Sequence, residues 1–245
     1  MNNNISNNSE NKFKTLKVIS IIASCLMLSA CATVDHIEGV NRKVFGFNEK
    51  VDEYFLKPVA TGYNNYTPAP LKSAISNIYN NIEDVYSIAN NVLQLKPQGV
   101  AEDTMRVAIN TVLGLGGTID IASKAGILRH KEDFGQTMGY WGIPDGPYIV
   151  LPILGPSTLR DTFGTALNTT LSPSALMHKD LERIVYNSVN IVRLRANLLD
   201  VTNSVDELAL DKYNFVKNAY LQKRKYDIYD GNIPEDKDDN STLTD

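Results

Sequence analysis

The chain has 245 residues, of which 43% are hydrophobic and 21% are charged, and its formal net charge is −4. A mildly acidic chain lacks the basic surface that binds nucleic acid, so no nucleic-acid partner is expected. The length is sufficient for one domain with a sizeable core. Both cysteines lie within the first 31 residues, so we expect neither a disulfide nor a cysteine-based metal site in the rest of the chain.

The N-terminus resembles a bacterial lipoprotein signal peptide. Three lysines precede an apolar run over residues 18–28 that is too short to anchor stably across a bilayer. The run ends in Leu28-Ser29-Ala30-Cys31, which predicts removal of residues 1–30 and acylation of Cys31, palmitate included. Residues 31–36 are then an acylated tether, and Ala32 after the cysteine favours the outer membrane of a Gram-negative bacterium.

Two alternatives to this interpretation remain. Ile22-Ala23-Ser24-Cys25 is a weaker version of the same pattern, and the segment could also be an ordinary secretory signal with an incidental cysteine. Without residues 1–30 the net charge is about −6, and no basic cluster is left to bind anionic lipid. Attachment would therefore depend on two or three acyl chains, since each buried methylene contributes about 0.8 kcal/mol.

From residue 37 onward the apolar residues recur mostly with helical spacing. We expect a helix over about 40–55 that is ended by Pro58, and a second over 71–92 with a break near Asn80-Asn81. A third is expected over 105–112, closed by Gly114, followed by a short one over 118–124. Apolar stripes of this kind ordinarily face a core. Their number on a membrane-anchored chain leaves open that some lie in the membrane interface.

The C-terminal part predicts two further helices. Asp180 is a candidate N-cap for a helix that runs to Leu199, and Ser204-Val205-Asp206-Glu207 fits a capping box for a helix that runs to about Tyr226. No convincing strand pattern is found, so the expected fold class is all-α, with one helical domain over residues 37–230. Residues 231–245 are acidic and without aromatic residues, which predicts a disordered tail.

The segment over residues 146–159 carries no charge. Pro147, Pro152 and Pro156 prevent one uninterrupted helix, and the segment is too short to span a membrane. A buried loop or short hairpin is the favoured interpretation, and a re-entrant segment that dips into lipid is the alternative. Arg160-Asp161 follows, either to fix a helix start through hydrogen bonds or to contact a lipid headgroup.

Signals for catalysis are weak, and we do not expect an enzyme, a cofactor or a metal site. None of the three histidines, His36, His130 and His178, stands at ligand spacing from a cysteine or another histidine, and His130 with Glu132 and Asp133 fits a charged turn better than a metal site. The segment Gly155-Pro156-Ser157-Thr158-Leu159 lacks the second glycine of a lipase nucleophile elbow. The glycines of Gly114-Leu115-Gly116-Gly117 lack the lysine and the preceding strand of a phosphate-binding loop, and they fit a helix end and a tight turn better.

A series of motifs in the same order resembles the MlaA family, also called VacJ, of outer-membrane lipoproteins. The likeness covers about residues 36–226 and begins with Asn41-Arg42, Phe45, Phe47-Asn48, Pro58-Val59-Ala60 and Tyr63. It continues with Asn91-Val92-Leu93-Gln94, Arg106, Asn110-Thr111-Val112-Leu113-Gly114 and Gly117-Thr118-Ile119-Asp120. It is densest in Asp133-Phe134-Gly135-Gln136-Thr137, Trp141-Gly142, Gly146-Pro147-Tyr148, Leu151-Pro152, Gly155-Pro156-Ser157 and Arg160-Asp161.

The resemblance implies amphipathic helices that form a ring or wedge in the outer membrane around an amphipathic channel. It implies retrograde phospholipid transport, in which phospholipids that have strayed into the outer leaflet are passed to a soluble periplasmic lipid carrier, so that lipid asymmetry is maintained. It further implies association with a trimeric porin and an inner-membrane transporter that supplies energy. The acidic tail has no clear counterpart in the family.

Within this interpretation we expect lipid-channel or membrane contacts from Phe45, Phe47, Tyr148, Ile149 and Leu151, and headgroup orientation by Arg160. The expected structural turns are at Gly114, Gly116, Gly117, Pro152, Gly155 and Pro156. The alternative function is a scaffold lipoprotein that tethers a porin to another envelope component without conducting lipid.

Overall fold

The computed structural model describes residues 34–234. The predicted signal peptide, the acylated Cys31 and most of the predicted acidic tail lie outside these residues. The chain divides into two compact units, Met1–Lys43 and Val44–Asp245, with the boundary inside helix α2 (Val34–Val51). In the first unit the described part is the helical stretch 34–43, so the helix begins within the predicted tether. Everything that follows concerns the second unit.

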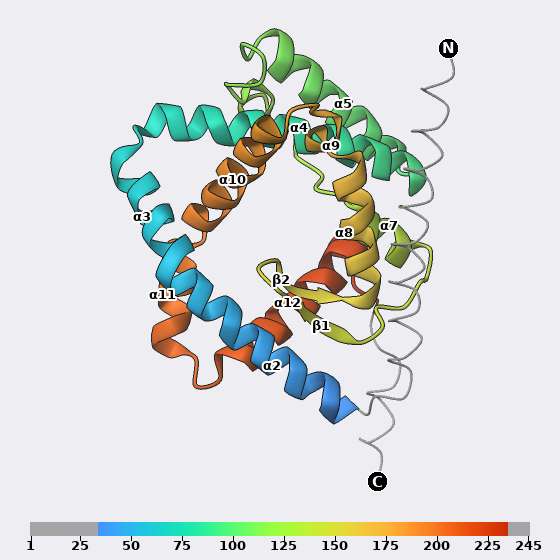
Figure 1. Cartoon of the computed structure of the whole chain (residues 1–245). Helices are drawn as coiled ribbons and strands as arrows, with labels where there is room; N and C mark the ends of the chain where they lie inside the picture. The colour runs from blue at the N-terminus through green and yellow to red at the C-terminus, as the bar shows by residue number, and fades with distance from the viewer. Residues whose placement is uncertain (1–33, 235–245) are drawn as a thin grey trace, which may run out of the picture. The chain divides into compact units, whose positions relative to one another are not determined.

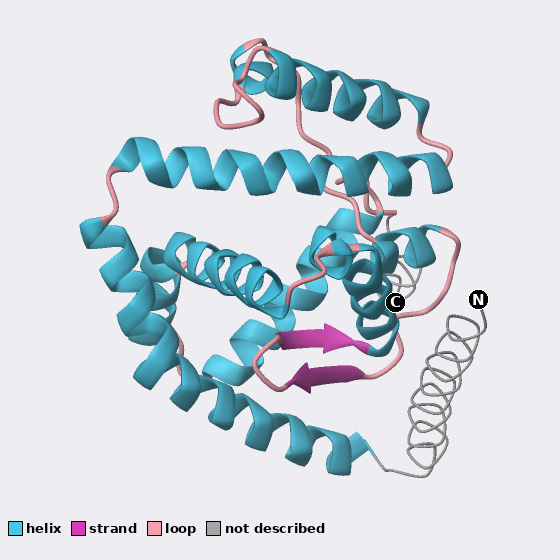
Figure 2. Cartoon of the chain, turned by 45° about the horizontal axis from the view of Figure 1, so that its top comes forward, coloured by secondary structure: helices cyan, strands magenta, loops and turns pink. Residues whose placement is uncertain are grey.

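The second unit is mainly helical, as predicted (Figure 2). After α2 come a π-helical turn η2 (Asp52–Leu56), α3 (Lys57–Tyr66), α4 (Ala69–Leu93), α5 (Pro97–Val112), α6 (Ile121–Lys124) and α7 (Phe134–Tyr140). Then follow strands β1 (Tyr148–Leu151) and β2 (Gly155–Thr158), α8 (Leu159–Leu171), α9 (Pro173–Leu176), α10 (Asp180–Asn197), α11 (Leu199–Leu208) and α12 (Lys212–Ile228). Within this unit, α3, α4, α8, α10 and the strand pair border a central space, and α5 packs along α4 (Figures 1 and 2). Among residues 34–234, no helix combines the length and the apolar character that crossing a membrane requires.

Several helix boundaries differ from the prediction; α5, for example, begins at Pro97 and not at about 105. Three of the differences have a local reason. Pro58 does not end a helix, because it lies in the first turn of α3, where its missing N–H costs no helical hydrogen bond, directly after the π-turn. Helix α4 continues through Asn80-Asn81 without a break. The single helix expected from Ser204 is two helices: Ser204 lies inside α11, and Asp211 caps α12 by accepting a hydrogen bond from the Asn214 N–H at 3.0 Å.

The uncharged segment forms a short antiparallel hairpin, one of the two forms that the favoured interpretation allowed. Tyr148 pairs with Thr158 and Leu151 with Gly155. The turn uses positive φ at Ile153 (67°) and Gly155 (84°). Asn48 fastens the turn to α2, because its Nδ2 donates to the Leu151 carbonyl at 2.9 Å and its Oδ1 accepts from the Ile153 N–H at 2.7 Å.

The apolar core of this unit is small. One cluster joins Ala60, Ala196 and Leu199. A second joins Tyr148 and Val150 of β1 to Tyr213 of α12, with Phe45 packed edge-on against Tyr213 at 5.5 Å between ring centroids. Because these two apolar clusters are small, polar and charged side chains fill most of the interior of this unit.

Candidate functional site

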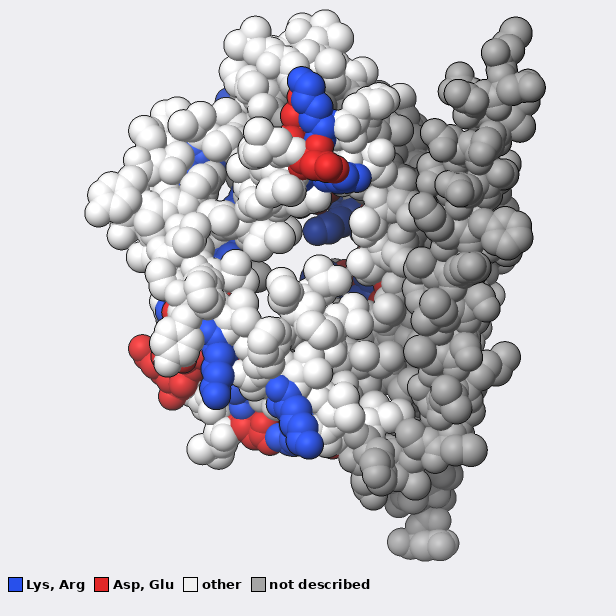
Figure 3. Space-filling view, viewed as in Figure 1, with Lys and Arg blue, Asp and Glu red and all other residues white. Residues whose placement is uncertain are grey.

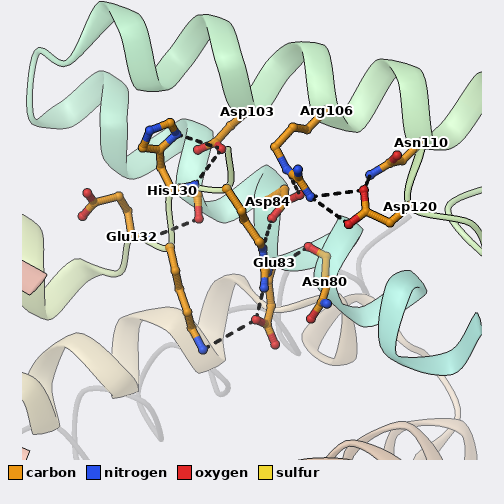
Figure 4. Close-up of polar contacts among 12 residues, drawn as sticks. Asn80, Glu83, Asp84, Asp103, Arg106, Asn110, Asp120, His130 and Glu132 are labelled. Atoms are coloured by element: carbon orange, nitrogen blue, oxygen red, sulfur yellow. Dashed lines mark hydrogen bonds and ion pairs between the residues drawn. The ribbon is translucent and has the colours of Figure 1, made fainter. Parts of the chain in front are cut away.

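The centre of the polar interior is Asp84 of α4, which is fully buried between two arginines (Figure 4). The Arg106 Nε of α5 donates to Asp84 Oδ2 at 3.2 Å, and the Arg129 Nε contacts Asp84 Oδ1. Arg106 also donates to the Ile127 carbonyl at 2.7 Å and lies 3.3 Å from Asp120 Oδ2. The segment over residues 118–130, which contains α6, is therefore held against α4 and α5 largely by charge.

Neighbouring Glu83 links this network to α10. Its carboxylate oxygens accept from Arg193 at 3.2 Å and from Arg129 at 3.1 Å. Arg193 is 3% exposed, and its guanidinium lies 4.9 Å from the centroid of the Tyr79 ring. The charge of Glu83 is thus shared by two arginines from distant parts of the chain.

Next to Asp84, the start of α7 is fastened to α4 by amides and carboxylates. Gln94 donates to Glu132 at 2.8 Å and to Thr137 at 3.0 Å, and Lys96 lies 3.1 Å from Glu132. Burial raises the pKa of Glu132 above its ordinary value, against the hydrogen bonds from Gln94 and Lys96 that lower it. Burial likewise raises the pKa of Asp103, which accepts a hydrogen bond from Asn91 at 3.0 Å.

A third polar cluster joins α7, α8 and α12 around Arg224. Its guanidinium donates to Asp161 at 3.0 and 2.8 Å and to Asp133 at 2.7 and 3.1 Å. Burial alone would raise the pKa of both carboxyls, but the hydrogen bonds and charge of Arg224 hold both below the ordinary value. Tyr220 donates a further hydrogen bond to Asp161 at 2.8 Å.

Polarity in this unit is therefore inverted. Its largest fully buried side chains are all polar: Arg106, Gln94, Asn90, Asn91, Thr158, Asp84, Asp103 and Ser87. The stripe predicted on α4 faces outward, with Leu71, Val85 and Val92 each about half exposed. Large apolar side chains are also exposed on the other helices and in the turn after α5, among them Phe55, Tyr66, Val112, Leu115, Ile184, Val201 and Leu208. The expectation that the stripes face a core is wrong for α4, because buried charges and amides occupy the opposite face.

The space-filling view shows a hollow in the middle of one face, with basic side chains at its edge and mostly uncharged surface around it (Figure 3). In the same unit, a cavity of about 350 Å³ lies between α4, α8 and α10. Tyr79, Glu83 and Tyr86 line it from α4, and Lys131 lines it from the loop before α7. Asn168 and Thr165 of α8 and Tyr186, Asn187 and Asn190 of α10 complete the polar wall. We call this the α4–α8–α10 cavity.

The residues predicted for lipid contact are not brought together in one place. Phe45 and Tyr148 belong to the second apolar cluster, so the prediction that they face lipid does not fit their packing. Arg160 is 5% exposed and bonded to Asp161, Asp145 and the Ile143 carbonyl, which agrees with the structural role and leaves no free guanidinium for a headgroup. Phe47 is half exposed, Ile149 and Leu151 are partly buried, and a lipid contact of these three stays a prediction.

The predicted turns at Gly114, Gly116 and Gly117 occur where φ or space demands glycine. A Cβ at Gly114 would collide with the Asn110 and Ile119 backbone oxygens, and Gly116 and Gly117 have φ of 70° and 86°. Pro152, Gly155 and Pro156 shape the hairpin turn. In the described residues, no group of three His, Cys, Asp or Glu side chains is placed to hold a metal ion.

The sequence did not single out Asp84, Arg129, Arg193, Lys131 or Arg224. One signal was available, because charged residues recur on α4 and α5 on the face opposite the apolar stripe. If the apolar stripe faces outward, the charged face lies in the interior.

The sequence and the fold have known counterparts. The family model described as MlaA lipoprotein matches residues 33–227. A Haemophilus influenzae protein named intermembrane phospholipid transport system lipoprotein MlaA is 33% identical over 239 residues, which cover 92% of this chain and 95% of that protein. An Escherichia coli protein of the same name is 31% identical over 246 residues, covering 92% and 94%. A solved structure described as "Structural basis for maintenance of bacterial outer membrane lipid asymmetry" superposes with a TM-score of 0.69 at 35% identity and covers 78% of this chain and 97% of that one.

Proposed function

Because the chain belongs to the MlaA lipoprotein family, we propose that it is an outer-membrane lipoprotein of an intermembrane phospholipid transport system. In this proposal acyl chains on Cys31 anchor it, and it removes mislocalised phospholipids from the outer leaflet without any enzymatic step. The lipids are handed to a soluble periplasmic carrier, so that the asymmetry of the outer membrane is maintained. A trimeric porin is the proposed partner within the membrane.

The observation that carries the proposal is the inverted polarity of residues 44–234. In water, exposed side chains such as Val112 (76%) and Leu115 (74%) lose the stabilisation of about 25 cal/mol per Å² that burial provides. In a bilayer the same faces contact hydrocarbon, and the buried charges, such as Asp84, Arg106 and Arg224, remain inside the protein with ion-pair partners. Amphipathic helices that lie in the membrane plane have this distribution.

The hollow provides the second part of the argument. A phospholipid headgroup needs a polar path, since a bare charge in hydrocarbon costs several kcal/mol or more. Its acyl chains favour an apolar wall. Polar residues of the α4–α8–α10 cavity together with outward-facing apolar stripes on α4 and α10 provide both kinds of surface in one unit. Passive conduction along such a path is the proposed mechanism.

The test measures outer-leaflet phospholipid in a Gram-negative strain that lacks its own family member. A membrane-impermeant amine reagent labels phosphatidylethanolamine on intact cells. We expect the full chain to lower the labelling several-fold and Cys31→Ser, which cannot be acylated, to lose the effect at equal protein level.

Native mass spectrometry of gently extracted protein distinguishes conduction from the scaffold alternative. Bound phospholipid supports transport. Unchanged labelling in cells, together with protein that carries a porin but no phospholipid, would contradict the transport proposal and favour the scaffold.

A further inference from the structure

We infer that the α4–α8–α10 cavity is a binding site for the phosphate of a glycerophospholipid headgroup, with Lys131 as its charged contact. The inference rests on the proposed function, since it assumes that phospholipid reaches the hollow. It assigns a specific binding site and a chemical class of ligand to the proposed lipid path.

The cavity has the size of a small ligand site, and its wall combines apolar and aromatic surface with polar side chains. Its volume of about 350 Å³ lies at the lower end of the range for ligand pockets, about 300–1,000 Å³. Amides and hydroxyls from three helices converge on it. The side-chain amides of Asn168 of α8 and Asn187 of α10 make no hydrogen bond within the described part of the chain, so these amide donors remain available.

Tyr186 adds another donor to the wall. Burial raises its pKa to about 12, so the phenol stays protonated at neutral pH. Its ring lies 4.9 Å from that of Tyr79, whose hydroxyl donates to the Tyr186 carbonyl at 2.7 Å, and this contact holds α10 against α4. The wall is thus preorganised and rich in donors, as anion binding requires.

Charge selects the ligand class. The carboxylates that line the cavity already have cationic partners: Glu83 has Arg129 and Arg193, Glu132 has Lys96, and Asp133 has Arg224. Lys131 is the loosely held cation of the wall: its side chain is 66% exposed, and its Nζ lies 3.7 Å from Glu83 Oε2. An exposed ammonium next to carboxylates that already have arginine or lysine partners, with neutral amide and hydroxyl donors on the same wall, favours an anion. A phosphodiester is the anion that every glycerophospholipid of this kind carries.

The experiment measures binding to the purified full-length chain in non-ionic detergent by isothermal titration. The probes are dioctanoyl phosphatidylglycerol, dioctanoylglycerol, which lacks the phosphate, and inorganic phosphate. We expect phosphatidylglycerol to bind at least tenfold more tightly than dioctanoylglycerol. We expect 10 mM inorganic phosphate to leave its affinity unchanged within twofold, since the acyl chains contribute the rest of the binding.

Lys131→Gln should weaken phosphatidylglycerol about tenfold and leave dioctanoylglycerol unchanged, and Lys131→Arg should stay within threefold of the native chain. The matched control is Lys179→Gln, another exposed lysine (77%) beside a glutamate, which should change affinity less than twofold. Asn187→Leu tests the neutral wall independently and should weaken phosphatidylglycerol several-fold. Circular dichroism confirms that each variant is folded.

Each unfavourable outcome has a separate meaning. Equal affinity for the two lipids, or equal behaviour of Lys131→Gln and Lys179→Gln, overturns the headgroup site, while lipid binding and reduced cell labelling leave the transport proposal standing. Displacement of phosphatidylglycerol by inorganic phosphate assigns the site to a free anion and overturns the lipid assignment. A native chain that binds neither lipid and does not lower labelling in cells overturns the transport proposal itself.

Discussion

The buried carboxylate of Asp84 gives the sharpest test of the polar interior. The change Asp84→Asn keeps the size of the side chain but removes a charge that is 0% exposed and shared by Arg106 and Arg129. Hydrogen bonds to charged groups contribute about 1.5–3 kcal/mol each, and removing one partner of a buried ion pair costs about 3–5 kcal/mol. In the variant Arg106 keeps its ion pair with Asp120, and Arg129 keeps its ion pair with Glu83. We therefore expect the free energy of unfolding to fall by about 3 kcal/mol, the lower end of this range.

The assay is urea unfolding in detergent micelles, followed by circular dichroism. The matched control is Asp180→Asn at the start of α10, where the carboxylate is 84% exposed and paired with Arg183. Exposed pairs contribute about 0–1 kcal/mol, so this variant should lie within about 0.5 kcal/mol of the native chain. If Asp84→Asn lowers the free energy of unfolding by less than about 1 kcal/mol, or no more than Asp180→Asn does, the view that charges hold this interior together is refuted.

The remaining predictions concern pH, the surface and one turn. Burial raises the pKa of Asp120, but hydrogen bonds and the charge of Arg106 hold it at about 2. The stabilisation from the ionised carboxylate is therefore complete above about pH 4 and is lost as the pH falls towards 2. Asp120→Asn should make the free energy of unfolding less dependent on pH over that interval, and an unchanged slope would contradict this. Val112→Asp should leave the free energy of unfolding in micelles within about 1 kcal/mol, because Val112 is exposed at the end of α5. The same change should weaken flotation with phospholipid vesicles, since a carboxylate on a lipid-facing surface is unfavourable. Equal flotation would argue against a lipid-facing α5. Gly117→Ala should lower the free energy of unfolding by about 1–2 kcal/mol in the same urea titration, because φ is 86° and the new methyl group would lie 2.9 Å from Asn81 Nδ2. A stabilised variant would show that the turn relaxes freely.

The longer helices were predicted best, because their apolar period is visible in the local sequence, whereas no bounds were predicted for α7, α8 and α9. Helix α10 (Asp180–Asn197) was expected over 180–199, and the end of α5 at Val112 was expected just before Gly114. Errors arose at residues whose type fits more than one place in a helix, so that the local sequence alone could not decide between them. Pro58 can end a helix or begin one, and the capping-box pattern at Ser204 fits helix interior equally well when Ser204 Oγ donates to the Asp200 carbonyl.

The site was harder to predict than the helices because its contacts are long-range. Arg193 and Glu83 are 110 positions apart, and Arg224 and Asp133 are 91 apart. Charged residues on α4 and α5 look like solvated faces as long as the apolar stripe is assumed to face a core. Only when α4 is placed between α5 and α10 do these residues become the interior.

A polar interior also explains why one chain can border a hollow without collapsing into it. Apolar side chains around an open space gain from closing it, because packing any two of them removes area from water. The carboxylates and guanidinium groups around α4 already have partners, as Asp84 has in two arginines, so closing the space would add little and would desolvate the groups that face it. Directional bonds from Arg193 to Glu83 and from Arg224 to Asp161 set the spacing of α10 and α12 from the rest of the unit. For the proposed lipid path, an interior of this kind predicts an open passage, because its most stable arrangement is already reached with the hollow present.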